Sequence, residues 1–556
     1  MLRRRGCLAV TAVLFLFAAA PAKRPAIPSL GETIEVSIAN VDVIVTDRDG
    51  HRVHGLTQAD FEIYEAGKLQ PISNFAEYRG TASPAAAGTI GTAAGAENAD
   101  AAPAQRRTLA IFLERFRLQN FRVDPFIASI KQLVRKTIRP GDAVSLIWFD
   151  EGAKLRLKAT DDVAAVEREL DAIARECIGP LDDKAAPVNA EMQNMIAFEQ
   201  AGAAMAAAHG MPRASTDPAT MVTFAARSSA LRARVEMNRR VAAINAVLHG
   251  LAGVEGKKTL LLAARRLGEF SGAEFYYMAG VANGILPPGE RDALDNRDQI
   301  KGLIANANAA GVTVYPVYPS GLDEHSSDPT VPDVSPNVLM NETAMLEQIA
   351  QKTGGLTSYG TADIVKLLPA VADDATDYYS LAYRVTTHHE DASRAIVVKT
   401  KDPSLRVRAR REFVEKSDDS LMHDRIVAAL YDEWRDSPVK LTATLGEPKA
   451  SGRNRRSAPL KVLIPIRALT LLPQNDKHAG AFTVYLISGG TLGEVSDVTR
   501  QTQTFEVPAA DLNRAMASHF TYQFDLNIRA GTQSVAVGVL DEVSKTYGIT
   551  TVRVMQ

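Results

Sequence analysis

Cysteine is nearly absent from this sequence, which has two cysteines in 556 residues. Cys7 lies in the N-terminal segment, and loss of that segment would leave Cys177 alone, so no internal disulfide is expected and the chain must rely on its hydrophobic cores. An excess of charge of one sign is also missing, because the formal net charge is −2 and 23% of the residues are charged. Composition therefore points neither to a nucleic-acid partner nor to an anionic membrane.

The short motifs of common enzyme classes are missing as well. The sequence contains no Walker-type phosphate loop, no His-Glu-x-x-His, no Gly-x-Ser-x-Gly elbow and no Cys-x-x-Cys pair. His388-His389-Glu390 supplies adjacent histidines, but neighbouring side chains diverge on a strand and rarely bind one metal ion, so we interpret this stretch as a surface loop. We expect a protein that is not an enzyme and that has no cofactor.

The N-terminus has the pattern of an export signal. Arg3-Arg4-Arg5 precede an apolar segment at residues 8–20, and Ala20-Pro21-Ala22 supplies small residues for cleavage. We predict a signal peptide at 1–22 and a secreted or periplasmic protein; an uncleaved anchor is the alternative. No later stretch is long and apolar enough to span a bilayer, so no transmembrane segment is expected in the mature chain.

Alternating apolar and polar residues predict a small β-sandwich module at 32–79. Residues 35–38 and 41–45 alternate, and Asp47-Arg48-Asp49-Gly50 is a turn signal. An acidic turn can hold calcium, but a solvated hairpin is the simpler interpretation. Residues 80–106 are rich in Ala, Gly, Thr, Ser and Pro, and this composition predicts a flexible linker.

From residue 107 to 413 the pattern becomes an alternation of strands and helices. The apolar run that starts at Thr108 ends in Glu114 and suits a strand buried on both faces. The Ala- and Met-rich residues 177–220 are expected to be a helical insertion. The fold class that follows is α/β, with a doubly wound, mainly parallel sheet. Its elements are expected as strands at 108–114, 141–150, 258–263 and 312–318, a short edge strand at 154–157, and helices at 124–139, 161–176, 224–250, 298–311, 341–353 and 363–374.

The last part of the sequence returns to β patterns. A strand is expected at 378–383, and a hairpin at 396–411 is expected to close or extend the edge of the parallel sheet, where its outward charges would prevent aggregation. A helical connector is predicted at 414–436. Residues 437–556 contain several alternating segments and predict a C-terminal β-sandwich. The α/β domain is thus expected between two β-sandwich domains.

Several of these stretches resemble a known family. The chain is similar to von Willebrand factor A domain proteins and, more narrowly, to the secreted "VWFA-related" proteins abundant in acidobacteria. The resemblance covers most of residues 35–413 and rests on Val41 to Asp47, Gly55-Leu56-Thr57, Asp60 to Glu65, Ile72 to Phe75, Pro140-Gly141-Asp142, Tyr378 to Tyr383 and Leu405 to Arg411. It implies a domain that binds protein ligands, commonly through a metal ion at the top of the sheet.

The metal-binding motif that the family implies is broken here. Glu114-Arg115-Phe116-Arg117-Leu118 replaces Asp-x-Ser-x-Ser after the first strand, and Ala264-Arg265-Arg266 replaces the Asp after a later one. We therefore expect a degenerate ion site without a bound metal, and hypothesise that Arg265 takes the place of the ion and pairs with Glu114. The residues of this region are Glu114, Arg115, Phe116, Arg117, Asp150, Thr160, Asp161 and Arg265.

Two other interpretations remain open. The carboxylates of Glu114, Asp150, Glu151, Asp161 and Asp162 could form a rebuilt cation site for ligand binding, or Glu114 and Asp150 could serve a hydrolase.

We favour an exported, non-catalytic protein that mediates protein–protein interaction or adhesion with an unknown protein ligand. Docking is expected at 177–220 and at the loops 265–297 and 319–340. The arginines of the helix at 224–250 could bind an acidic partner, although a solvated helix face is the default interpretation; they are Arg232, Arg234, Arg239 and Arg240.

Overall fold

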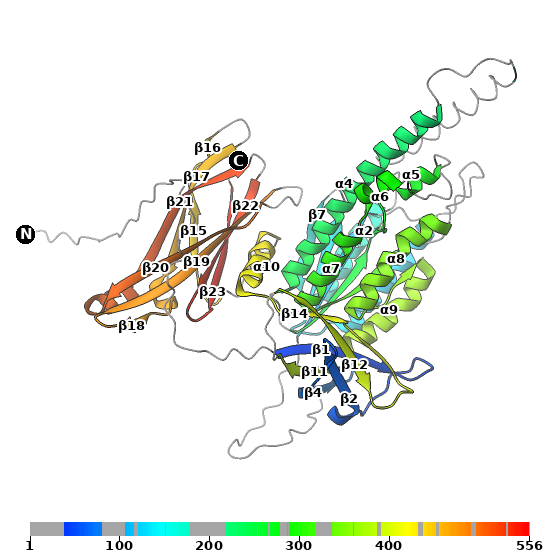
Figure 1. Cartoon of the computed structure of the whole chain (residues 1–556), viewed down its shortest axis with the longest axis horizontal. Coiled ribbons are helices and arrows are strands. Elements are labelled where there is room, and N and C mark those ends of the chain that lie inside the picture. The colour runs from blue at the N-terminus through cyan, green and yellow to red at the C-terminus, as the bar shows by residue number, and fades with distance from the viewer. Residues whose placement is uncertain are drawn as a thin grey trace, which may run out of the picture. The chain divides into compact units, whose positions relative to one another are not determined.

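The fold is taken from a computed structural model of the whole chain (Figure 1). It describes residues 38–80, 106–115, 120–150, 152–177, 208, 218–252, 254, 256–264, 267–278, 286, 288–318, 336–359, 361–385, 391–431, 437–451, 455–490, 496–529 and 532–554. The chain divides into two compact units, one made of residues 36–248 and 254–415 and the other built chiefly from residues 416–556. The expected signal peptide, most of the linker and insertion, and His388-His389-Glu390 lie outside the described residues.

A six-stranded sheet forms the centre of the first unit. Its order is β10-β9-β8-β5-β6-β7, and all neighbouring strands are parallel except β6 and β7. The order reverses between β5 and β8, as in doubly wound α/β folds. The predicted class of this sheet is confirmed. Its strands are β5 (Arg107–Glu114), β6 (Ala143–Phe149), β7 (Ala153–Thr160), β8 (Lys257–Ala263), β9 (Val312–Tyr318) and β10 (Ser358–Tyr359).

Helices cover both faces of this sheet. The first face packs against α1 (Asn120–Thr137), α2 (Val163–Cys177) and α9 (Thr361–Thr376) in one apolar cluster, which includes the buried Cys177. The opposite face carries α4 (Pro218–Ala252), α7 (Arg297–Ala310) and α8 (Pro336–Thr353). Every residue of β5 after Arg107 is buried, which explains its unbroken apolar run.

The expected strand at 378–383 and hairpin at 396–411 do not extend the parallel sheet, and that prediction is wrong. They pair with the N-terminal strands in two four-stranded sheets, β13-β1-β11-β4 and β14-β12-β2-β3, which share one apolar core. The predicted module at 32–79 is therefore completed by residues 378–414. The strands are β1 (Ile38–Thr46), β2 (Phe61–Glu65), β3 (Lys68–Gln70), β4 (Ile72–Tyr78), β11 (Tyr378–Arg384), β12 (Ser393–Thr400), β13 (Arg406–Ala409) and β14 (Glu412–Val414).

A buried carboxylate on α9 links these sheets to the α/β domain. Asp374 is fully buried and accepts hydrogen bonds from Arg408 on β13 at 2.6 Å and from the Tyr315 hydroxyl on β9 at 2.8 Å. Arg52, from the turn after β1, binds the second carboxylate oxygen. Burial, together with the nearby Asp374 carboxylate, raises the pKa of Tyr315 well above its usual value, so Tyr315 donates as a neutral phenol.

The second unit consists of two antiparallel sheets that share an apolar core. The predicted connector is more than a linker, because α10 (Asp418–Tyr431) packs Met422 and Ile426 against Tyr485 and Ala536 in a second apolar cluster. The strands are β15 (Thr442–Leu445), β16 (Lys449–Ala450), β17 (Arg455–Pro465) and β21 (His519–Arg529) in one sheet, and β18 (Leu472–Gln474), β19 (Lys477–Gly490), β20 (Thr499–Pro508), β22 (Thr532–Asp541) and β23 (Tyr547–Arg553) in the other. Across the described residues of both units, no helix combines the length and apolar character needed to cross a membrane.

Candidate functional site

The carboxyl edge of the parallel sheet is the first place to look for a site. Ligands of doubly wound folds bind beyond the carboxyl ends of the strands, at the point where the strand order reverses. Here that point lies between β5 and β8, which end at Glu114 and Ala263. Glu114 therefore occupies the position from which a ligand or an ion would be bound.

Glu114 forms a buried ion pair with Arg240 of α4. The Arg240 guanidinium donates from Nη2 to Oε1 at 2.6 Å and from Nε to Oε2 at 3.0 Å, and both side chains are 5% exposed. Arg240 also lies over the Phe149 ring at 5.9 Å, beside the end of β6. A bidentate guanidinium occupies both carboxylate oxygens and places positive charge where a cation would have to bind.

A second arginine–carboxylate pair lies along the same edge. Arg115 Nη1 donates to Asp150 Oδ2 at 3.1 Å, and each side chain is 33% exposed. The backbone N–H of Arg115 donates to the Phe149 carbonyl at 2.8 Å, which continues the β5–β6 ladder beyond the last residues of the strands. Both predicted carboxylates of the edge, Glu114 and Asp150, are thus paired with arginine.

The predicted residues Thr160, Asp161 and Asp162 lie at the opposite end of the sheet. Strand β7 runs antiparallel to β6, so Thr160 pairs with Val144 near the beginning of β6. Asp161 accepts a hydrogen bond from the Gly141 N–H at 3.1 Å, and Asp162 accepts one from the Ala165 N–H at 3.0 Å in the first turn of α2. The prediction of a rebuilt acidic site is wrong for these residues, because β7 runs antiparallel to β6 and places them at the other end of the sheet. The sequence could not show that this edge strand reverses direction. Phe116, Arg117, Glu151 and Arg265 lie outside the described residues.

An arginine does pair with Glu114, but the partner that the structure describes is Arg240 rather than Arg265. The interpretation of the helix arginines as a solvated face is wrong for Arg240. A sequence signal existed, because Arg240 falls within an apolar stripe at helical spacing, formed by Met237, Val241, Ile244 and Leu248, each of which is buried.

Among the described residues that follow β8, those at 267–272 form a packed loop. Fully buried Asn296 donates from Nδ2 to the Gly268 carbonyl at 2.9 Å and accepts from the Ser271 hydroxyl at 3.0 Å and from Arg234. Asn341 of α8 binds the same loop. Its side chain accepts a hydrogen bond from the Phe270 N–H at 2.7 Å and donates one to the Phe270 carbonyl at 3.0 Å. Sequence analysis missed both asparagines, because neither belongs to a motif. They fix the loop beside Arg240.

A small polar recess lies between this loop and α4. Its volume is about 20 Å³, which is enough for a water molecule and far too small for an organic substrate. Three lining residues belong to α4, and the others belong to the loop, to α5 (Ala273–Met278) and to α8. The lining residues are Ala233, Glu236, Arg240, Gly268, Phe270, Ser271, Gly272, Glu274 and Asn341.

We expect Asn296→Ala to destabilise the protein by about 2–3 kcal/mol, because the Gly268 carbonyl, Ser271 and Arg234 lose their buried partner. Urea unfolding measures this change, and hydrogen exchange at residues 268–272 should become faster. Asn245→Ala is the matched control. Asn245 is half-buried and accepts one hydrogen bond, from Asn306 at 3.1 Å, so its loss should cost about 1 kcal/mol or less. Equal effects of the two substitutions would contradict the role given to Asn296.

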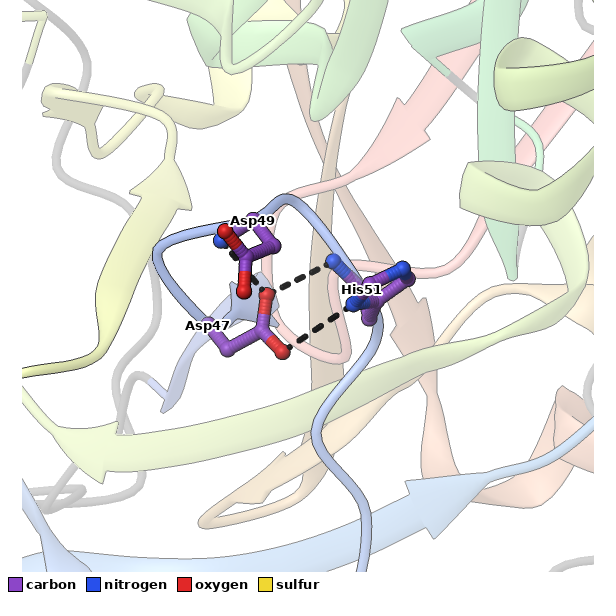
Figure 2. A group of neighbouring side chains, drawn as sticks. All are labelled: Asp47, Asp49 and His51. Carbon is purple, nitrogen blue, oxygen red and sulfur yellow. Dashed lines mark hydrogen bonds and ion pairs between the residues drawn. The ribbon is translucent and has the colours of Figure 1, made fainter.

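A second acidic group lies in the turn after β1, far along the sequence from this edge. Figure 2 shows Asp47, Asp49 and His51 on one side of the turn. The Asp47 carboxylate accepts hydrogen bonds from the N–H groups of Asp49 and His51, both at 2.9 Å. The His51 N–H is the main reason that the pKa of Asp47 is lowered. This pattern shapes an exposed turn, and it agrees with the interpretation of a solvated hairpin.

The fold and the edge define a doubly wound α/β protein in which the carboxylate at the point of strand-order reversal, Glu114, forms an ion pair with an arginine. Searches with protein-family models and of curated proteins find no match.

Among solved structures, three similar chains are a serine-substituted aerotolerance-related membrane protein from Bacteroides fragilis, the conserved hypothetical protein BatB from Bacteroides thetaiotaomicron, and the vWF domain of the type V pili tip protein Mfa5 from Porphyromonas gingivalis. Their sequence identities are 14%, 11% and 10%, and the matches cover 48%, 49% and 48% of this chain and 98%, 96% and 94% of theirs. The TM-scores are 0.23, 0.23 and 0.24, so these likenesses assign neither family nor function. The fold class stands on the strand order described above.

Proposed function

We propose that this chain is an exported, non-catalytic protein that binds another protein without the help of a metal ion. The observation that carries the proposal is the ion pair between Glu114 and Arg240 at the switch point of the sheet. Export rests on the signal pattern at residues 1–22. Protein binding is inferred by analogy with other proteins in which a rigid scaffold positions binding loops.

The donor set at the edge supports metal independence. Magnesium needs several oxygen ligands in octahedral geometry, and calcium needs six or more. The edge instead presents Glu114 bound by Arg240 and Asp150 bound by Arg115. A divalent cation would have to displace a guanidinium and stay close to its charge. The residues present therefore do not fit the ion that the family resemblance implies.

The same contacts disfavour the hydrolase. A pair of carboxylates that acts as general acid and base must reach a substrate, and their pKa values must differ. Glu114 is buried and paired with a guanidinium, and the recess beside it has room for water only. We infer that the Glu114 and Asp150 carboxylates stabilise the structure of the carboxyl edge through their arginine partners.

Isothermal titration of the purified full chain with magnesium, manganese and calcium chloride tests the metal independence. We expect no binding heat in the millimolar range, and the same result for Glu114→Ala. Heat that appears with the unaltered chain and disappears with Glu114→Ala would establish a rebuilt ion site and overturn the proposal. Arg115→Ala is the control, because it removes a positive charge from the edge and leaves the Glu114–Arg240 pair in place.

A further inference from the structure

We propose that the exposed side of the first half of α4 binds an acidic amphipathic helix of a partner protein. This inference rests on the proposed function and names the class of its partner. The surface, called the α4 stripe here, consists of Phe224, Leu231 and Val235, whose exposed fractions are 71%, 44% and 50%. In a soluble protein, large apolar side chains that are exposed together mark an interaction surface more often than single ones do.

The spacing of the α4 stripe fits contact with another helix. Its members are seven and four residues apart, which places them within about 40° of one another around the helix axis. This width is that of a helix–helix seam, and it is narrower than the apolar face of a helix that lies in a membrane surface. The other side of this half of α4 is already covered, because Ala226 and Ala230 pack in a buried cluster with Phe275 and Tyr276.

Unpaired positive charge borders the stripe. Arg232 and Arg239 are exposed and form no ion pair with any residue in the part of the chain that the structure describes. They follow Leu231 and Val235 by one and four residues, so both lie on the same side of the stripe. A partner helix with glutamate or aspartate beside its apolar seam would meet these arginines. Charge complementarity of this kind fixes which partner is accepted.

The position of the stripe agrees with the proposed function. Arg240 lies at the carboxyl edge, where it binds Glu114, and α4 continues from there toward its N-terminus. Phe224 precedes Arg240 by sixteen residues, which corresponds to about 24 Å of helix. The stripe therefore extends outward from the edge at which doubly wound domains bind their ligands, and the N-terminal end of α4 stands clear of its neighbouring helices in Figure 1.

Self-association fits the charges less well. If two copies paired their stripes in antiparallel fashion, the side that carries Arg232 and Arg239 would face the same side of the other copy. Like charges at such flanking positions oppose pairing. An acidic helix removes this repulsion and replaces it with attraction.

Two synthetic peptides of about 20 residues test the inference against the purified full chain by fluorescence anisotropy. Both carry leucine at the seam positions; one has glutamate at the flanking positions, and its twin has lysine. We expect the glutamate peptide to bind at least about tenfold more tightly, and less so at high salt. Leu231→Ser with Val235→Ser should abolish binding, and Arg232→Glu with Arg239→Glu should reverse the preference. Met340→Ser, at an exposed apolar residue of α8, is the control that should change nothing.

Five results would overturn the inference. The first is equal affinity of the two peptides, and the second is binding that neither pair of stripe substitutions changes. The third is binding that appears only after deletion of residues 181–211. The fourth is a dimer, detected by light scattering, that the Leu231→Ser, Val235→Ser variant dissociates. Competition by phosphatidylglycerol vesicles at the stripe would identify a lipid surface instead and would overturn it too. None of the variants touches Glu114, so failure of the peptide experiment and failure of metal independence can be told apart.

Discussion

A fragment that starts at residue 105 and ends at 415 should fail to fold, whereas residues 36–415 should unfold in one cooperative transition. The shorter fragment lacks β1 to β4, although it keeps β11, which lies between β1 and β4 in its sheet. The loss of β1 and β4 exposes the apolar residues Leu381 and Tyr383 and leaves both edges of β11 without hydrogen-bond partners. It also removes Arg52 from the buried Asp374.

Circular dichroism and size exclusion of the two fragments measure this effect. We expect aggregation of 105–415, and a single melting transition for 36–415. Asp374→Ala within 36–415 removes the carboxylate that joins Arg408 and Tyr315 and keeps all the strands. We expect the stability of this variant to lie between those of the two fragments. A stable, monomeric 105–415 fragment would show that the α/β domain does not need the N-terminal strands.

Arg240→Met should destabilise the protein by about 3–5 kcal/mol, because it removes two charge-assisted hydrogen bonds from a buried carboxylate. Glu114→Leu combined with Arg240→Met should recover most of that loss, since an apolar pair of similar volume avoids the cost of burying charge. Chemical denaturation of the single and double variants gives the coupling between the two positions.

The neighbouring pair provides the control for this comparison. Arg115→Met removes the same type of side chain from the same edge, but its ion pair with Asp150 is one-third exposed and screened by solvent. Its cost should stay below about 1 kcal/mol. If Arg240→Met lowers the free energy of unfolding as little as Arg115→Met does, then the buried pair does not stabilise the edge.

Much of the central sheet could be predicted from sequence, because its strands and helices carry local signals. The run of β5 is apolar on both faces, and Gly354, which follows α8, has a positive φ of 83°, the conformation in which glycine commonly ends a helix. Strand pairing across the chain could not be predicted. The alternation of β12 shows that one of its faces is buried, but it does not say that its partner, β2, lies more than 300 residues earlier in the chain.

Three residues of the stretches that carry the resemblance, Asp142, Asp60 and Tyr379, make contacts that stabilise the fold. The Asp142 carboxylate accepts hydrogen bonds from the backbone N–H groups of Arg107 and Arg139 at 2.9 and 3.0 Å, and it holds the start of two strands together. Asp60 accepts from the Thr57 N–H at 2.7 Å, and the Tyr379 hydroxyl donates to the Val53 carbonyl at 3.0 Å. These contacts explain a fold and say nothing about a ligand.

The most direct measurement is a crystal structure of the full chain soaked in manganese chloride, with anomalous scattering recorded. We expect Glu114 to remain paired with Arg240 at hydrogen-bonding distance and no anomalous peak in contact with its carboxylate. A manganese ion bound to Glu114, with Arg240 turned away, would contradict the claim that an arginine closes this edge of the sheet.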